Sequence, residues 1–290
     1  MITLTKNTVR ALVAACALTV SAGGAMAAGG GKHFEKQDWS FSGPLGKYDK
    51  AQLQRGFQVY KEVCSSCHSL EYIAFRNLGE DGALGYNPDQ IKALAAEYEV
   101  EDGPDDEGEM FTRAAKPFDT FPSPYPNVQA AKSANGGAYP PDLSLIAKAR
   151  AGSMGPDTGI EPLTDLVRMV WHTVTAYQEY GPDYLYALLT GYEEAPEGVD
   201  VGDLNYNPNF IAGNALAMAP PLDDELVEYT DGSPMTKEQY AKDVSAFLMW
   251  AAEPKLEQRK RVGVNALIFL VIFAGLLYFT KKRVWSDVDH

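Results

Sequence analysis

Residues 53–68 read Leu-Gln-Arg-Gly-Phe-Gln-Val-Tyr-Lys-Glu-Val-Cys-Ser-Ser-Cys-His, an apolar repeat that leads into two closely spaced cysteines and a histidine. Apolar side chains recur here at i, i+4, i+7 and i+11, which is the spacing of one face of an α-helix. These side chains are Leu53, Phe57, Tyr60 and Cys64. The stretch therefore predicts a helix that ends at a Cys-x-x-Cys-His motif.

This motif is the attachment signature of a c-type haem. The thiols of Cys64 and Cys67 would add across the two vinyl groups of the porphyrin, and the imidazole of His68 would then face the iron as its proximal ligand. The spacing has a mechanical reason, because sulfurs three residues apart on one turn reach both pyrrole edges. One motif predicts one covalently bound haem c.

Other uses of the two cysteines fit the sequence less well. A structural zinc site needs four ligands, but apart from the motif the chain offers only His33, His172 and His290 as further histidines. None of them has the spacing of a partner ligand. A thioredoxin-like redox pair lies between a strand and a helix of a βαβ unit, whereas this motif follows a helical stretch.

The iron of such a haem has a sixth position to fill, and Met218 is the candidate that the sequence favours. Residues 213–222 read Gly-Asn-Ala-Leu-Ala-Met-Ala-Pro-Pro-Leu, which is typical of neither strand nor helix, and the two prolines stiffen the loop. Alternatively, Met218 fills a gap under the loop. His172, on a helix predicted over 162–180, lies away from the apolar stripe of that helix, and Met249 belongs to a predicted core helix. Ligation by histidine and methionine leaves no open site and favours electron transfer.

The first 27 residues are typical of a cleaved export signal. Lys6 and Arg10 supply a positive start, an apolar run follows, and residues 25–27 (Ala-Met-Ala) match a small-x-small cleavage site. A lipoprotein cleavage site at Cys16 is the alternative, but too few apolar residues precede it. We expect the mature chain to begin near residue 28 with two cysteines, and therefore without a disulfide framework.

Near the other end of the chain, residues 262–279 are eighteen residues without a charge. They make about 27 Å of helix at 1.5 Å per residue, and basic residues flank them on both sides. This pattern predicts a transmembrane anchor rather than a buried core helix. The expected domains are a signal peptide (1–27), an exported haem domain (28–254), the anchor (262–279) and a cytoplasmic tail (280–290).

The chain has 25 basic and 39 acidic side chains, and its net charge of -14 excludes a nucleic-acid binder. Residues 28–254 alone carry 16 basic and 36 acidic side chains, a balance of -20. Eight of these carboxylates lie within residues 97–109, mixed with Gly and Pro, which predicts a solvated loop. The run serves either solubility or the docking of a basic partner. Its spacing does not match a calcium-binding loop.

Together with four further segments, the helix and the haem motif make the chain resemble the cytochrome c1 family over most of residues 37–286. The segments are Tyr-Pro-Pro-Asp-Leu-Ser at 139–144, Tyr-Leu-Tyr-Ala-Leu-Leu-Thr-Gly-Tyr at 184–192, Met-Ala-Pro-Pro at 218–221, and Phe-Leu-Met-Trp-Ala-Ala-Glu-Pro-Lys at 247–255. Members of this family are the haem subunit of ubiquinol:cytochrome c oxidoreductase, the cytochrome bc1 complex. The combination is far more specific than the haem motif alone.

By this resemblance, Cys64 and Cys67 bind the haem covalently, and His68 and Met218 are the axial ligands of its iron. Some bacterial members carry an extra cysteine pair near the methionine loop, and this chain has none. We therefore expect packing and prolines to hold that loop.

The resemblance implies three further haem contacts. Arg150 matches an arginine that pairs with a haem propionate, and a guanidinium offers a planar fork to such a carboxylate. Tyr184 matches a haem-contacting tyrosine, and Pro141 is expected to pack on the haem edge.

The implied fold is mostly α. It is a class I cytochrome c-like helical haem domain with long loop insertions near 97–127 and 193–214, plus one C-terminal transmembrane helix. The role of residues 171–179 stays open.

The implied function is electron transfer within the bc1 complex, by a chain that is not catalytic alone. A mobile Rieske iron–sulfur protein would pass an electron to this haem, and the haem would pass it to a soluble or tethered cytochrome c that docks on the acidic surface. The other implied partner is cytochrome b, in a dimeric complex. The expected location is the inner membrane of a bacterium, with the haem domain on the periplasmic side.

Two rival functions share the haem motif. One is a membrane-anchored c-type subunit of a terminal oxidase or nitric oxide reductase, which usually has its anchor at the N-terminus. The other is a haem enzyme with an open iron site, such as a peroxidase, which would bind carbon monoxide rapidly when reduced.

Overall fold

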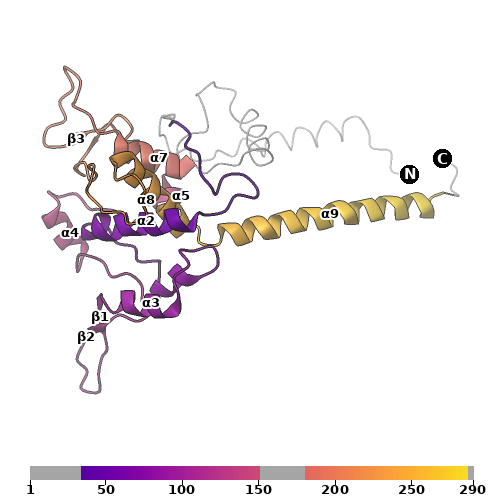
Figure 1. The fold of residues 1–290 in the computed structure, drawn as a ribbon, viewed down its shortest axis with the longest axis horizontal. Coiled ribbons are helices and arrows are strands. Elements are labelled where there is room, and N and C mark those ends of the chain that lie inside the picture. Colours follow the sequence, from indigo (N-terminus) through magenta and orange to yellow (C-terminus); the bar gives the residue numbers. More distant parts are fainter. Residues whose placement is uncertain (1–33, 151–179, 287–290) are drawn as a thin grey trace, which may run out of the picture. The chain divides into compact units, whose positions relative to one another are not determined.

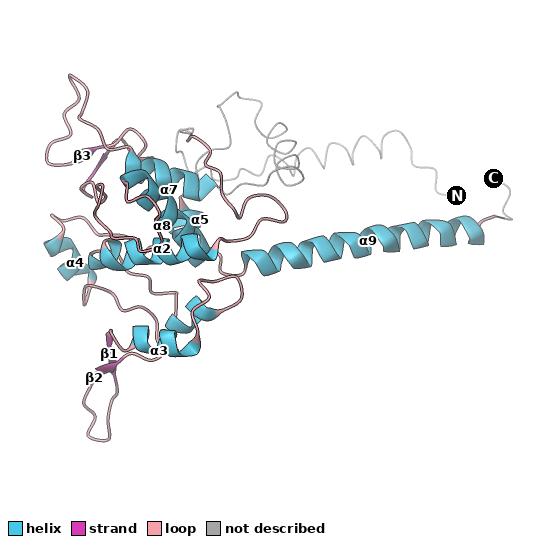
Figure 2. Ribbon diagram, viewed as in Figure 1, coloured by secondary structure: helices cyan, strands magenta, loops and turns pink. Residues whose placement is uncertain are grey.

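A computed structural model describes residues 34–150 and 180–286 of the chain (Figure 1). The described α-helices are α2 (Lys50–Glu62), α3 (Pro88–Ala95), α4 (Val128–Ala134), α5 (Ile146–Ala149), α7 (Tyr180–Thr190), α8 (Lys237–Ala252) and α9 (Leu256–Val284). Two short 3-10 helices are η1 (Cys64–Ser66) and η2 (Phe75–Gly79). Two antiparallel strand pairs complete the list, β1 (Glu99–Asp102) with β2 (Phe111–Ala114) and β3 (Asn205–Tyr206) with β4 (Ala215–Leu216). Figure 2 shows helices joined by long loops, so the predicted mostly α class is confirmed.

Helix α2 is the helix that the apolar repeat predicts. The carboxylate of Asp49 caps its first turn, accepting from the backbone N–H of Ala51 at 2.9 Å. Leu53, Phe57 and Tyr60 are buried along one face. The helix ends at Glu62, so the haem motif begins just beyond its last turn.

Helix α8 packs across α2 at very short range. A Cβ atom built at Gly56 would lie 2.1 Å from the backbone oxygen of Asp243 and 2.7 Å from Cβ of Phe247. Only glycine therefore permits this crossing, and the two helices enclose an aromatic core that includes Phe57 and Trp250. The predicted core role of Met249 is confirmed, because its side chain is fully buried in α8.

A buried ion pair crosses the same helix contact. The Nε atom of Arg55 donates to the fully buried carboxylate of Asp243 at 2.8 Å, and Nη1 donates to Asp231 at 2.8 Å. Tyr229 Oη and Gln239 Nε2 also donate to Asp243, at 3.1 and 2.9 Å. Burial alone would lower the pKa of Arg55, but the hydrogen bonds and charges of both carboxylates outweigh it and raise that pKa.

Helix α7 packs against α5 and α8, as Figure 1 shows. A Cβ at Gly181 would lie 1.5 Å from the backbone oxygen of Ala147, so the start of α7 touches the α5 backbone directly. The next acidic residue, Asp183, is buried and accepts from Trp39 Nε1 at 2.8 Å and from the Gln37 backbone at 2.9 Å. These bonds attach the segment before α2 to the start of α7.

The acidic run at 97–109 corrects one expectation. It is not only a solvated loop, because β1 lies within the run and pairs as a hairpin with β2, which follows it. Arg113 on β2 holds this hairpin through ion pairs with Asp102 and, at 2.6 Å, with Asp119. Its hydrogen bonds to these two carboxylates raise the pKa of Arg113 and lower the pKa of each carboxyl.

Helix α9 contains the whole predicted anchor, 262–279. Its most apolar eighteen-residue window has a mean hydropathy of 2.4 and buries nothing within the protein, which fits a single membrane span. Near its start, Leu256 is fully buried, and the carboxylate of Glu257 accepts from the Tyr48 backbone at 3.0 Å. The export signal, the helix predicted over 162–180 and His172 lie outside the described residues, except that Tyr180 begins α7.

We expect Asp243→Ala to destabilise the full-length protein by about 3–5 kcal/mol, because it leaves the Arg55 charge without its buried partner. Asp231→Ala removes the exposed partner of the same arginine and should destabilise the protein far less, because water screens this pair. Urea unfolding in mild detergent, followed by tryptophan fluorescence, measures both changes. Similar small losses for the two variants would contradict a stabilising role for the buried pair.

Candidate functional site

The candidate site begins where α2 ends and the chain turns through η1. The backbone N–H of His68 donates to the Cys64 oxygen at 2.9 Å, which closes one turn around the two cysteines. Both cysteines are free thiols and half-buried. Burial raises the pKa of the Cys64 thiol to about 12, with a further contribution from Cys67. A thiol that stays protonated is a poor redox nucleophile, which argues against a thioredoxin-like pair.

His68 is held by a residue far away in the sequence. Its Nδ1 atom lies 2.8 Å from the backbone oxygen of Pro141, and because a carbonyl oxygen can only accept, Nδ1 carries the proton. The lone pair is then on Nε2, which is the arrangement of a metal-ligating histidine. On the backbone side, Tyr60 Oη donates to the His68 oxygen at 3.2 Å.

Asp142 fixes the position of that carbonyl. One carboxylate oxygen accepts from Ser69 Oγ at 2.8 Å and from the Glu71 backbone at 2.9 Å. The other oxygen accepts from the Ser144 backbone at 2.8 Å. Asp142 therefore ties the segment after the haem motif to the segment that begins with Pro141.

The surroundings of His68 favour a neutral imidazole. Burial lowers its pKa, against the opposing effects of the Pro141 hydrogen bond and the Asp142 charge. A neutral imidazole is the form that binds a metal.

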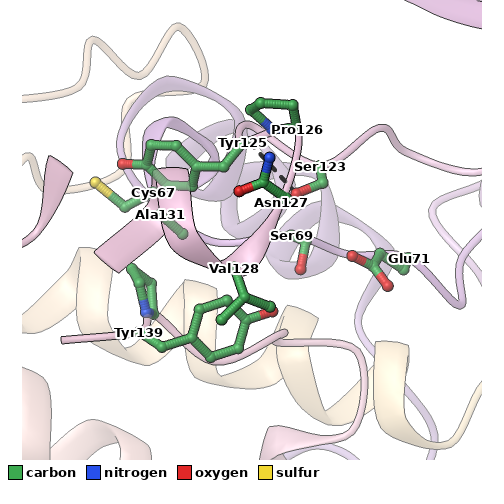
Figure 3. A pocket seen from close by; sticks show the side chains of 11 residues that line it. Cys67, Ser69, Glu71, Ser123, Tyr125, Pro126, Asn127, Val128, Ala131 and Tyr139 are labelled. Atoms are coloured by element: carbon green, nitrogen blue, oxygen red, sulfur yellow. Dashed lines mark hydrogen bonds between the residues drawn. The ribbon is translucent and has the colours of Figure 1, made fainter. Parts of the chain in front are cut away.

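A cavity of about 170 Å³ adjoins Cys67. It is lined by Cys67, Ser69, Glu71, Ser123, Tyr125, Pro126, Asn127, Val128, Ala131, Tyr139 and Pro140. Figure 3 shows Cys67 at one side of this cavity, with Tyr125 and Tyr139 between it and Glu71. The volume is below the roughly 300–1,000 Å³ of typical cofactor pockets, so the cavity is too small for a whole cofactor. It has room for one edge of a large flat group that is attached at Cys67.

Met218 lies in a loop that leaves the β3–β4 pair. The strand β4 ends at Leu216, so the residues around Met218 are irregular, as the sequence predicts. The Met218 side chain is half-buried, and its backbone oxygen accepts from Tyr192 Oη at 3.1 Å. Hydrogen bonds thus add to the packing and prolines that were expected to hold this loop.

The two other predicted haem contacts lie close to each other. Tyr184 is 2% exposed on α7, and its ring packs 5.2 Å from that of Phe34. Burial raises its pKa, against opposing effects from a hydrogen bond to the Ile211 backbone and from the Arg150 charge. Arg150 itself is exposed and forms no ion pair within the described ranges, so its guanidinium is available to an anionic group.

The predicted site residues therefore form two groups. Cys64, Cys67 and His68 meet Pro141. Arg150 lies within electrostatic range of Tyr184 on α7, and Tyr192, just beyond the end of that helix, binds the Met218 backbone. Sequence reasoning placed Tyr60 on the apolar face of the helix and assigned no role to Asp142 or Tyr192, although all three lie inside segments that carry the family resemblance.

These residues fit a covalent haem. Two free thiols lie beside an imidazole whose Nε2 has a lone pair, and a cavity adjoins one thiol. Within residues 34–150 and 180–286, no group of three or more His, Cys, Asp or Glu side chains could hold a metal ion by itself.

Comparison with known proteins supports the same conclusion. The model of the Cytochrome C1 family matches residues 39–288. The chain is 44% identical to "Cytochrome c1" of Rhodospirillum rubrum over 97% of this chain and 98% of that one, and 48% identical to "Cytochrome c1" of Blastochloris viridis over 90% and 89%. It is also 54% identical to "Cytochrome b/c1" of Bradyrhizobium diazoefficiens over 86% of this chain, which corresponds to about a third (35%) of that longer protein.

The residues matched by the family model include the haem motif, the methionine loop and the apolar C-terminal helix. The chain belongs to the cytochrome c1 family, whose members carry a single covalent haem c and are the electron-transfer haem subunit of the bc1 complex.

Proposed function

We propose that this protein holds its haem through thioether bonds from Cys64 and Cys67, with His68 and Met218 as axial ligands. The Nδ1–H···O bond between His68 and Pro141 carries the proposal, because it leaves Nε2 aimed for coordination. The loop that contains Met218 is held by a hydrogen bond at that residue, as a weakly binding thioether requires. When bound, the haem supplies one reversible electron at iron.

The remaining contacts orient the haem edges. Arg150 pairs with a propionate, since its charge is unpaired among the described residues and lies within electrostatic range of the buried Tyr184. Tyr184 packs against the macrocycle from α7. Pro141 packs on the haem edge. Its carbonyl oxygen has a second role, because it accepts a hydrogen bond from Nδ1 of His68 and so orients the imidazole.

The partners follow from family membership. The chain works with cytochrome b and the Rieske protein in the bc1 complex. The finer steps are part of our proposal: the Rieske protein donates the electron, a soluble or tethered cytochrome c accepts it, and the complex is a dimer. Since the family model covers 39–288, a c-type subunit of another oxidoreductase is no longer a competing assignment.

The acceptor docks on the acidic hairpin in this proposal. Carboxylates of Glu101, Glu107 and Glu109 are exposed, whereas Asp102 is paired with Arg113. A field of this sign steers a lysine-rimmed partner and accelerates encounter more than it adds affinity.

The haem domain (28–254) faces the periplasm and the tail (280–290) the cytoplasm. The support is the export-like start of the sequence together with α9, which is the one helix among the described residues that is long and apolar enough to span a membrane. Cleavage near residue 28 belongs to the same proposal.

Replacing Met218 with Leu should abolish the near-infrared sulfur-to-iron band and lower the haem potential by a sizeable part of the roughly 0.8 V that axial ligands span. The reduced variant should bind carbon monoxide, which the parent protein resists. Absorption spectra and redox titration measure these changes. Met235→Leu, at an exposed position, is the matched control, and a band that survives Met218→Leu would show that another group is the ligand.

The rate of acceptor reduction should fall about tenfold or more as the salt concentration rises from low to physiological values, because screening weakens the steering field. A variant with Gln at positions 101, 107 and 109 should have a lower rate and a shallower salt dependence. Gln at the exposed glutamates 193, 194 and 197 is the control for net charge. Stopped-flow reduction kinetics separate the two, and equal effects would refute docking at the hairpin.

In intact spheroplasts, external protease should cleave the haem domain while an epitope tag added after His290 stays protected until the membrane is permeabilised. N-terminal sequencing of the purified protein should begin near residue 28. Immediate loss of the tag in sealed spheroplasts would reverse the proposed orientation.

A further inference from the structure

We propose that Tyr192 is a positioning residue for the axial methionine: its hydroxyl holds the Met218 backbone so that the thioether remains at the iron. This inference rests on the proposed ligand role of Met218. It assigns a role to a residue for which the sequence suggested none.

The contact joins two segments that are distant in the chain. Tyr192 lies two residues beyond the end of α7, and its Oη donates to the Met218 oxygen at 3.1 Å across 26 residues. Among the described residues, no other side chain forms a hydrogen bond to Met218. The nearby Pro220 and Pro221 have no backbone N–H to offer, so the loop has few other means of fixing its backbone.

The connection between β3 and β4, which precedes the methionine loop, is attached to the same helix. The side-chain amide of Asn207, which is fully buried, donates to the Leu188 oxygen at 2.7 Å, and that of Asn209 donates to the Ala187 oxygen at 2.9 Å. Carbonyls at the end of a helix lack partners within it, and these amides satisfy two of them. A Cβ at Gly191 would lie 2.2 Å from Asn209 Nδ2, so glycine is required for this close approach.

The C-terminal end of α7 and the residues just after it therefore contact both segments: the asparagines attach the β3–β4 connection, and Tyr192 attaches the backbone of Met218. A phenol with its ordinary pKa of about 10 is a hydrogen-bond donor at physiological pH. The bond is part-buried, which limits competition from water.

The size of the effect follows from the strength of one hydrogen bond. A typical intramolecular hydrogen bond changes a conformational equilibrium by roughly two- to tenfold. Loss of the Tyr192 hydroxyl should therefore raise the population in which Met218 has left the iron by about this factor. Because phenylalanine keeps the ring and its packing, the helix and the haem attachment should be unaffected.

The test uses the full-length, haem-loaded protein in mild detergent and compares Tyr192→Phe with Tyr206→Phe. Tyr206 lies on β3 in the same loop system, and its hydroxyl has no hydrogen-bond partner among the described residues. We expect Tyr192→Phe to increase the rate of carbon monoxide binding to the reduced protein two- to tenfold. It should also lose the near-infrared sulfur-to-iron band at a lower temperature than the parent protein, while Tyr206→Phe matches the parent.

A double-mutant comparison separates this inference from the ligand assignment. In a Met218→Leu background, Tyr192→Phe should add no further change in carbon monoxide binding, because both act through the same ligand. An additive change, or a Tyr192→Phe protein with a lower unfolding temperature but parental band and binding rate, would reduce Tyr192 to a structural residue and overturn the inference. If the Met218→Leu protein keeps the near-infrared sulfur-to-iron band, Met218 is not the ligand. The inference then fails because the ligand assignment is wrong, and this outcome is distinguishable from a failure of Tyr192 alone.

Discussion

At Gly56 the backbone of α2 lies against the backbone of α8, closer than any side chain at that position would permit. The contact aligns Arg55 with the buried carboxylate of Asp243. It also sets the direction in which α2 ends, and the two cysteines follow two and five residues beyond that end. The position of the haem motif relative to the core therefore depends on the absence of one side chain.

From this crossing outward, both halves of the haem site are positioned in the same manner, by polar side chains that bind backbone atoms. Asp142 holds the Pro141 segment against the residues after the haem motif, and Pro141 in turn orients His68. On the other half, Tyr192 and two asparagines hold the methionine loop. A rigid frame on both sides keeps the ligand geometry nearly the same in the two oxidation states. A small change in geometry means a small reorganisation energy for electron transfer, which suits an electron carrier.

Sequence patterns predicted the parts of this protein whose cause is local. The helix before the haem motif follows from apolar spacing, and the anchor follows from eighteen uncharged residues. Long-range contacts were not predictable in this way. The hydrogen bond between His68 and the Pro141 carbonyl joins residues 73 positions apart, and no periodic pattern in the sequence indicates such a contact. The hairpin in the acidic run was missed for a related reason, because ion pairs of Arg113 rather than alternating apolar residues hold it.

The acidic surface illustrates how the structure refines a compositional argument. Composition treats every carboxylate in the run 97–109 alike, but their environments differ. Asp102 is paired with Arg113, Glu97 is paired with Lys61 at 2.6 Å, and Asp105 accepts from backbone N–H groups in the hairpin turn. The remaining glutamates contribute the field that a partner would meet, so the effective charge of the hairpin is smaller than its residue count suggests.

The two half-buried thiols of the haem motif lead to a practical conclusion about biogenesis. Apart from these two, the chain has only Cys16, which lies in the proposed export signal. After the proposed cleavage and haem attachment, no sulfhydryl would remain to react with a maleimide or with an oxidant. Thiol labelling of the processed protein would therefore measure the fraction of chains to which no haem has been attached. The same scarcity means that an incomplete chain can make only one wrong intramolecular bridge, between the two sulfurs that await the porphyrin, and a reductant in the export compartment would reverse it.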